Sequence, residues 1–384
     1  MSERKNIQVL KPKYRVQECL DEIRDCMEIG WTGMGNKTTE FEEAWKDYTG
    51  LPHAHMVNSA TAGLHLAVNI LKQAYGWQDG DEIISTGLTF VSTNHAIMYE
   101  NMVPIFADVH ADDLCLDPAS IEKKITPRTR AVMYVGLGGR VGHLDAVRDL
   151  CKKHGLKLIL DAAHMTGTRY NHQHVGHNAD VTVFSFQAVK NLPTADAGMI
   201  CFADAEFDAK ARKMSWLGID KDTASRSSAK GTYKWRYDVP HLGFKYHGNS
   251  VMGAIGLVQL RYIDGDNQHR RMIADVYNHY LEFNPKIWLP KDVDGAKSSC
   301  HIYQVALNNR DEVLSGLNNL GIYPGVHYVD NSHYHMYRQY NPDTNTFSRE
   351  ISERLLSLPC HLEMDLDDAH RVAESLLEVV SELS

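Results

Sequence analysis

An acid and an amine follow two apolar segments of the chain, and together they could hold a cofactor. The run at 156–160 ends at Asp161, and the run VTVFSF at 181–186 is followed by Gln187 and Lys190. Because ligands of a doubly wound sheet gather at the carboxyl ends of its strands, we expect both side chains to reach one pocket. A lysine can form a Schiff base, and a carboxylate can keep a pyridinium nitrogen protonated. The pair therefore indicates pyridoxal 5'-phosphate (PLP) chemistry, although a solvated lysine and a helix-capping aspartate would explain each residue alone.

A possible phosphate site lies earlier in the chain, in NSATAGLHLAV at 58–68. Small residues there precede an apolar helix, whose first N–H groups could bind a phosphate together with the hydroxyls of Ser59 and Thr61. A simple Ser/Thr helix cap explains the same residues and is the favoured interpretation if the segment is taken alone.

The composition excludes several classes of protein. The 384 residues carry a formal net charge of -9 with no basic stretch, which argues against binding to nucleic acid. No segment approaches the roughly 20 apolar residues of a membrane span, and the start of the sequence does not resemble a signal peptide. The seven cysteines form no CxxC pair, so we expect reduced thiols. These features predict a cytoplasmic protein that binds neither nucleic acid nor membranes.

Apolar strand-like runs alternate with helical patterns between about residues 40 and 200, which predicts an α/β fold with a large, mostly parallel sheet. We expect helices at 60–73, 91–101 and 143–154, and strands at 82–85, 103–108, 131–135, 156–160 and 181–186. After Gly248 the pattern predicts one or two long helices with a break near Asp264–Gly265.

The C-terminal part of the chain indicates a smaller α+β domain, with a strand at 301–307 and helices at 310–320 and 367–383. We therefore expect a large domain over 1–260, which includes the N-terminal segment, and a small C-terminal domain over 261–384.

Nine segments, in order and over nearly the whole length, resemble the DegT/DnrJ family of sugar aminotransferases, which are fold-type I PLP enzymes. The resembling segments are 30–50, 58–68, 87–109, 125–147, 156–164, 181–190, 243–260, 325–329 and 355–364. The resemblance implies a fold-type I aminotransferase, with the large sheet domain flanked by helices.

The resemblance also implies roles for residues around the cofactor ring. Lys190 would carry PLP as the internal aldimine, and Asp161 would pair with the ring nitrogen; these two are the expected catalytic residues. Phe90 takes the position of the aromatic side chain that stacks on the ring. His164 stands near the 3-hydroxyl, where relatives usually have glutamine.

At the phosphate, the resemblance implies the backbone of Ala60 and Thr61 together with the Ser185 hydroxyl. Lys245 falls where relatives place a residue that reaches the phosphate from the neighbouring subunit, which implies a homodimer with shared active sites. The full expected cofactor set is Ser59, Ala60, Thr61, Phe90, Asp161, His164, Ser185, Gln187, Lys190 and Lys245.

Three residues are candidates for substrate contact: Thr32, His327 and Tyr328, of which His327 could equally be a packed core histidine. The implied reaction moves an amino group from L-glutamate to a keto-sugar, best matched by a nucleotide-linked keto-deoxy sugar in polysaccharide or natural-product amino-sugar biosynthesis. A cyclitol ketone or another keto-sugar stays open as the acceptor.

Two rival functions also remain. A PLP-dependent sugar dehydratase is one of them, although the dehydrating branch of the family has histidine where this chain has Lys190. A non-catalytic sensor that keeps the fold is the other.

Other motifs point to no second cofactor. The glycines of GLGGRVG at 136–142 miss the GxGxxG spacing of a dinucleotide site. Histidine-rich segments at 172–177 and 333–337 could suggest a metal site. The first has no cysteine or acidic residue at zinc-site spacing, so we expect 172–177 to be a solvated loop. We therefore predict no metal site.

Overall fold

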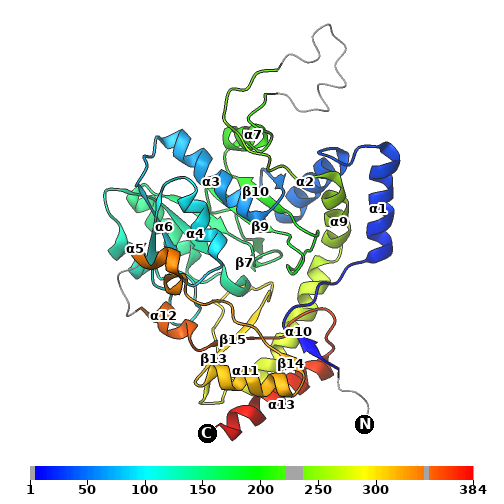
Figure 1. Ribbon diagram of the computed structural model, residues 1–384, viewed down its shortest axis with the longest axis vertical. Coiled ribbons are helices and arrows are strands. Elements are labelled where there is room, and N and C mark those ends of the chain that lie inside the picture. Colours follow the sequence, from blue (N-terminus) through cyan, green and yellow to red (C-terminus); the bar gives the residue numbers. More distant parts are fainter. Residues whose placement is uncertain (1–4, 221–236, 341–345, 384) are drawn as a thin grey trace.

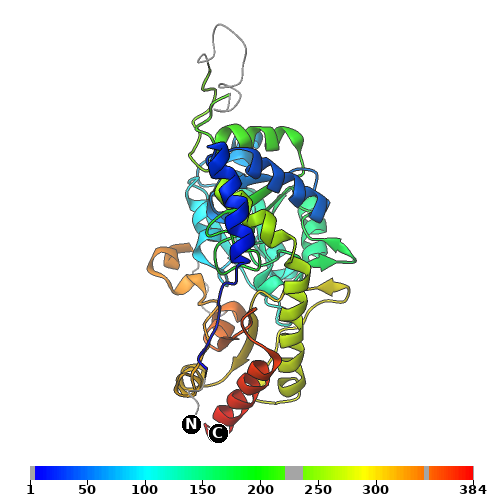
Figure 2. The ribbon, with the colours of Figure 1, turned by 90° about the vertical axis from the view of Figure 1, so that its right-hand side faces the viewer.

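The computed structural model describes residues 5–220, 237–340 and 346–383. A larger part is built around one sheet, and a smaller part lies below it (Figure 1). At the far end of the smaller part, β1 (Ile7–Gln8) lies close to α13 (Leu366–Glu382), and the Arg371 guanidinium donates to the Lys5 carbonyl there (Figure 2). No helix within the described ranges is both long and apolar enough to span a bilayer.

The large sheet has seven strands in the order β2-β10-β9-β6-β5-β3-β4, and five consecutive strands of it run parallel to one another. Those five are β3 (Glu82–Thr86), β4 (Val103–Ala107), β5 (Thr129–Val135), β6 (Lys157–Asp161) and β9 (Val181–Ser185). Strand β10 (Gly198–Phe202) runs antiparallel to both β9 and β2 (His55–Val57). The expected α/β fold with a mostly parallel sheet is confirmed.

Helices cover both faces of this sheet, which explains why its strands are apolar almost throughout. A cluster of buried side chains lies on each face of the sheet. Along β5, Ala131 and Met133 belong to the first cluster, and Val132 and Tyr134 belong to the second. The first cluster includes α3 (Ala60–Tyr75), α4 (Val91–Met98) and α7 (Ala205–Met214), and the second includes α2 (Asn36–Thr49), α5 (Pro118–Lys124) and α6 (Leu144–His154).

Two helices lie side by side at one edge of the large part, α1 (Val16–Ile29) and α9 (Ser250–Leu260) (Figure 1). Helix α10 (Ile263–Leu281) follows and leads into the smaller part. Of the one or two long helices predicted, two are present, and they meet at Arg261–Tyr262, shortly before the predicted break near Asp264–Gly265. Asp264 instead lies in the first turn of α10, where a carboxylate is stabilised by the helix dipole.

The smaller part has its own core around a three-stranded antiparallel sheet, in the order β11-β13-β15. Its elements are β11 (Ile287–Trp288), β13 (Tyr303–Leu307), α11 (Arg310–Asn319), β14 (Ile322–Tyr323), α12 (Phe347–Ser352) and β15 (Leu355–Leu358). Strand β1 pairs with β14, so the N-terminal segment touches this part. The division between 1–260 and 261–384 stays a prediction.

A third small sheet joins β7 (Arg169–Tyr170), β8 (Gln173–His174) and β12 (Ala296–Lys297). The expectation of a solvated loop at 172–177 is wrong for His174, which is 2% exposed. Its Nε2 atom accepts a hydrogen bond of 3.0 Å from the Gly167 N–H, so the imidazole is a packed core group.

Candidate active site

The predicted acid, Asp161, is the last residue of β6, and its carboxylate is buried in the sheet. The Thr93 hydroxyl on α4 donates to Oδ2 at 2.8 Å, and the Ala163 N–H donates to Oδ1 at 3.1 Å. Burial raises the pKa of this carboxyl, while the two donors and the nearby Lys190 ammonium lower it. The carboxylate is therefore held in a fixed orientation at the carboxyl end of its strand.

The predicted amine, Lys190, follows β9 by one turn, in which the Lys190 N–H donates to the Gln187 carbonyl at 2.8 Å. The side chain reaches a cavity, yet burial of the amine lowers the pKa of Lys190 to about 8, against the raising effect of Asp161. A lysine with such a pKa is partly neutral near physiological pH. It can therefore act as a nucleophile or a base.

His301 is a site residue that the sequence did not reveal. Its Nε2 atom lies 3.5 Å from Lys190 Nζ, and its Nδ1 atom lies 2.8 Å from Asn191 Oδ1. The Asn191 amide donates its own protons to Ser299 O and Asn267 Oδ1, so its oxygen must accept from His301 Nδ1. Burial holds the pKa of His301 well below its usual range. A neutral His301 therefore presents the Nε2 lone pair to Lys190.

A second neutral histidine, His164, lies against His301 with ring centroids 4.4 Å apart. The Gly138 N–H donates to its Nδ1 at 3.2 Å, and burial holds its pKa well below the usual range. Its proton must therefore sit on Nε2, which lies 3.1 Å from the Tyr328 hydroxyl and donates to that oxygen. The Tyr328 hydroxyl proton is left free to donate elsewhere.

His327 is the remaining predicted histidine, and its Nδ1 lies 3.0 Å from the Ser357 hydroxyl. Burial, with a smaller effect of the Lys190 charge, lowers its pKa to about 4. His327 is therefore neutral at physiological pH. It is partly buried and borders the Lys190 cavity, and its contact with substrate stays a prediction.

The predicted phosphate loop lies between β2 and α3. The Ser59 hydroxyl caps α3 by accepting from the Ala62 N–H at 3.1 Å, as the helix-cap interpretation requires. The N–H groups of Ala60 and Thr61 donate to no other residue in the described part of the chain. A Cβ on Gly198 of β10 would lie 2.7 Å from the Ala60 nitrogen, so a glycine is needed beneath this loop. The loop thus offers two open donors beside its cap.

Except for His301 and Asn191, the functional side chains described above border one cavity of about 450 Å³. It is lined, among others, by Ser59, Ala60, Thr61, Phe90, Asp161, His164, Ser185, Gln187, Lys190, His327 and Tyr328. Two of the predicted site residues lie elsewhere. Thr32 is exposed in the connection between α1 and α2, and Lys245 Nζ lies 3.2 Å from the ring centroid of Trp216.

The residues present fit PLP. The cavity lining offers open N–H donors and the Ser185 hydroxyl for a phosphate, and an acid and an amine for a pyridine ring and an aldehyde. The Phe90 ring is 56% exposed at the cavity, and its centroid lies 6.0 Å from that of Tyr328. An apolar ring face is therefore available for stacking.

The sequence is similar to those of known proteins over most of its length. The sequence model of the DegT/DnrJ/EryC1/StrS aminotransferase family matches residues 13–377. The chain is 33% identical over 375 residues to the spore coat polysaccharide biosynthesis protein SpsC of Bacillus subtilis (strain 168), with 95% of each protein covered.

Two solved structures extend the likeness to three dimensions. The putative sugar aminotransferase Spr1654 of Streptococcus pneumoniae in its PMP-form superposes with a TM-score of 0.91 at 26% identity, over 99% of this chain and 100% of that one, and it is also known in a PLP-form. Helicobacter pylori PseC, an aminotransferase involved in the biosynthesis of pseudaminic acid, superposes with a TM-score of 0.89 at 27% identity, over 98% and 100%. The expected fold-type I aminotransferase architecture is confirmed.

Proposed function

This chain belongs to the DegT/DnrJ/EryC1/StrS aminotransferase family and is a PLP-dependent aminotransferase, and we propose that it moves the amino group of L-glutamate to a nucleotide-linked keto-deoxy sugar. The observation that carries the proposal is the meeting of Lys190 and Asp161 in one cavity with an open phosphate loop. The descriptions of SpsC as a spore coat polysaccharide biosynthesis protein and of PseC as an enzyme of pseudaminic acid biosynthesis support a product that enters polysaccharide or amino-sugar biosynthesis. We propose a cytoplasmic location for the reaction.

The cofactor would be held at three places. When bound, PLP links covalently to an amine and withdraws electrons from the carbon that bears it. Asp161 would keep a proton on the ring nitrogen, because its fixed carboxylate can accept one further hydrogen bond. The N–H groups of Ala60 and Thr61, with the Ser185 hydroxyl, would bind the phosphate, and Phe90 would cover one ring face.

Lys190 would move the reacting proton. With a pKa of about 8, its amine can take a proton from the substrate carbon at Nζ and release it again near neutral pH. The Nε2 lone pair of His301 would orient the amine by accepting a hydrogen bond from it. Asn191 fixes the tautomer that makes this possible.

The substrate side would be formed by Tyr328 and His327. The free hydroxyl proton of Tyr328 would donate to a carbonyl or hydroxyl oxygen of the substrate, since its oxygen already accepts from His164. A keto-sugar offers several such oxygens, which suits the hydroxyl of Tyr328 and the neutral imidazole of His327 at the cavity.

Two surface features support a homodimer with shared sites. Lys245 is exposed and lies outside the cavity of its own chain, so its amine would reach the phosphate of a second subunit. On α1, Val16, Leu20, Met27 and Ile29 are each at least 50% exposed. An apolar surface of this kind is typical of an interface. Thr32, which follows α1, would reach the neighbouring substrate in the same way.

The decisive experiment separates the two half-reactions. The purified holoenzyme is mixed with L-glutamate alone, and release of 2-oxoglutarate is measured together with the change in cofactor absorbance. Nucleotide-linked keto-sugars and cyclitol ketones are then tested as acceptors. We expect release with glutamate and turnover with a nucleotide-linked keto-sugar, and none with Lys190→Ala. Loss of water from the sugar without any glutamate half-reaction would contradict amino transfer.

A further inference from the structure

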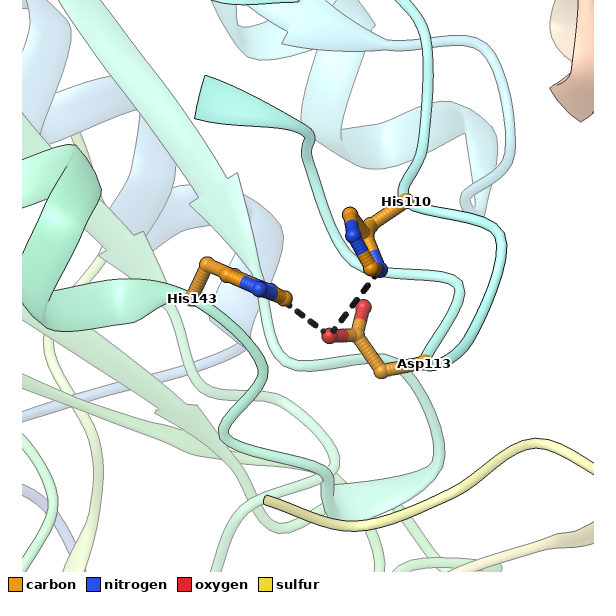
Figure 3. Close-up of side chains that lie close together, drawn as sticks. All are labelled: His110, Asp113 and His143. Atoms are coloured by element: carbon orange, nitrogen blue, oxygen red, sulfur yellow. Dashed lines mark hydrogen bonds and ion pairs between the residues drawn. The ribbon is translucent and has the colours of Figure 1, made fainter. Parts of the chain in front are cut away.

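Two histidines and an aspartate meet away from the Lys190 cavity, on the loop after β4 and at the start of α6 (Figure 3). The Asp113 Oδ2 atom lies 2.9 Å from His143 Nδ1 and 4.0 Å from His110 Nδ1. The two imidazole rings face each other with centroids 4.2 Å apart and planes inclined by 42°. One nitrogen of each ring and one carboxylate oxygen lie within 4.8 Å of one another. None of the three residues lines the Lys190 cavity.

The Asp113 carboxylate is buried, with its side chain 2% exposed, and it is held in one orientation. Its Oδ1 atom accepts a hydrogen bond of 2.8 Å from the Cys115 N–H, which leaves Oδ2 directed at the two histidines. The nearby Arg140 guanidinium donates to the main-chain carbonyl of Asp113, at 2.9 Å from Nε, and forms no ion pair with the carboxylate. In the described part of the chain, the only ion-pair partners of this buried carboxylate are the two histidines.

The two imidazole rings lie with centroids 4.2 Å apart and planes inclined by 42°, and the same carboxylate oxygen lies within 4.0 Å of a nitrogen of each ring. A divalent ion held between these three groups would offset the charge of the buried carboxylate.

We propose that His110, Asp113 and His143 bind a Zn²⁺-type divalent transition-metal ion. Two imidazole nitrogens and one carboxylate oxygen are a ligand set that zinc accepts, with water completing a tetrahedral shell. Ligand atoms around a tetrahedral zinc are about 3.3 Å apart. The observed 2.9 and 4.0 Å lie on either side of that spacing. His110 Nδ1 also accepts a hydrogen bond of 3.3 Å from the Asp112 N–H, which the ion would replace. Both histidines are partly exposed, which gives an ion access from solvent.

The ion would join two segments that are far apart in sequence. The loop that carries His110 is closed by backbone hydrogen bonds, from the His110 N–H to the Cys115 carbonyl at 2.7 Å and from the Leu114 N–H to the His110 carbonyl at 3.1 Å. A metal bond to His143 would fasten this loop to the start of α6. The site is independent of the proposed amino transfer, because it shares no residue with the Lys190 cavity.

The test is Zn²⁺ binding to the full-length holoenzyme after treatment with a chelator that is then removed. Calorimetric titration should give one ion per chain, and His110→Ala, Asp113→Asn and His143→Ala should each weaken Kd by roughly 100-fold or more. Zn²⁺ at a hundredfold excess over Kd should raise Tm of the wild-type protein by roughly 3 °C. This shift should disappear in all three variants.

His154→Ala is the matched control, because His154 is an exposed histidine 3.7 Å from a carboxylate, that of Glu122, but belongs to no three-ligand cluster among the described residues. Its Kd should equal the wild-type value. The glutamate half-reaction of the three ligand variants should be unchanged, which shows that they are folded. X-ray absorption of the zinc-loaded protein should show nitrogen and oxygen neighbours only. A sulfur neighbour, absence of stoichiometric binding, or equal Kd in the ligand variants would overturn the proposal.

Discussion

Two groups of residues at the Lys190 cavity are built differently, and we call them the ring end and the phosphate end after the parts of PLP that they would hold. At the ring end, Asp161, His164 and His301 are buried. Their side chains already form hydrogen bonds to other residues of the same chain. At the phosphate end, the Ala60 and Thr61 N–H groups have no described partner, and Lys245 lies on the surface. The ring end is therefore preorganised for chemistry. The phosphate end has donors that a ligand and a second subunit would satisfy.

The largest effect is expected at the ring end, from Lys190→Ala. Removal of the amine should lower kcat by roughly 10³-fold or more, because no other group in the cavity can both form the covalent link and move the proton. PLP should still bind non-covalently through the phosphate end. Equilibrium dialysis and steady-state kinetics measure the two effects. Substantial remaining turnover would refute the role of Lys190.

Asp161→Asn should lower kcat by roughly 10²-fold or more, because a neutral amide cannot keep the ring nitrogen protonated. It should also change the pH at which the protein without cofactor captures PLP. Capture needs the neutral amine, so its rate should rise with pH through the Lys190 pKa of about 8. Since the Asp161 carboxylate raises that pKa, the midpoint should move to lower pH in the variant. An unchanged midpoint would show that the two charges are not coupled.

His301→Leu tests the part of the ring end that the sequence did not reveal. Loss of one hydrogen-bond acceptor should lower kcat by about fivefold. It should also move the midpoint of the pH dependence of PLP capture to lower pH, because the ammonium form of Lys190 loses a hydrogen-bond partner. His301→Gln keeps an acceptor and should recover part of both effects. If Leu and Gln behave alike, His301 is only a packing residue.

At the phosphate end, Ser185→Ala should weaken the Kd of PLP by roughly tenfold, which is the loss expected for one charge-assisted hydrogen bond. The kcat at saturating PLP should change little, in contrast to the ring-end variants. Fluorescence titration with PLP gives Kd, and the glutamate half-reaction gives the rate. A large loss of kcat with unchanged Kd would place Ser185 in the proton transfer instead.

The smallest effect is expected from Lys245→Ala, because an exposed amine is screened by water and salt. The Kd of PLP should rise by a few-fold, and more at low ionic strength. When Lys190→Ala and Lys245→Ala subunits are mixed at low PLP, about a quarter of the wild-type sites should be complete in a shared-site dimer. No recovery of activity would mean that Lys245 serves its own chain or no phosphate at all.

The features that could be predicted from the sequence are those that local residue patterns determine. Asp161 and Ser185 end apolar strands, and such runs mark the ligand edge of a parallel sheet. His301 and Asn191 were missed because their contact joins residues 110 apart, and neither stands in a recognisable motif. The same holds for His110, Asp113 and His143, which only the folded loops bring together.

Errors in the predicted elements also have local causes. The predicted helix break lies slightly late, because glycine and aspartate interrupt the apolar spacing but both fit the first turn of the second helix. The polar neighbours of His174 predict a solvated ring, but pairing with segments beyond the local sequence buries it.

The most direct test of the central claim is to reduce the holoenzyme with borohydride and map the modified peptide by mass spectrometry. We predict a single reduced cofactor adduct, on Lys190, which disappears after incubation with L-glutamate before reduction because the amino group then resides on the cofactor. An adduct on another lysine, or an adduct on Lys190 that glutamate does not remove, would contradict the assignment.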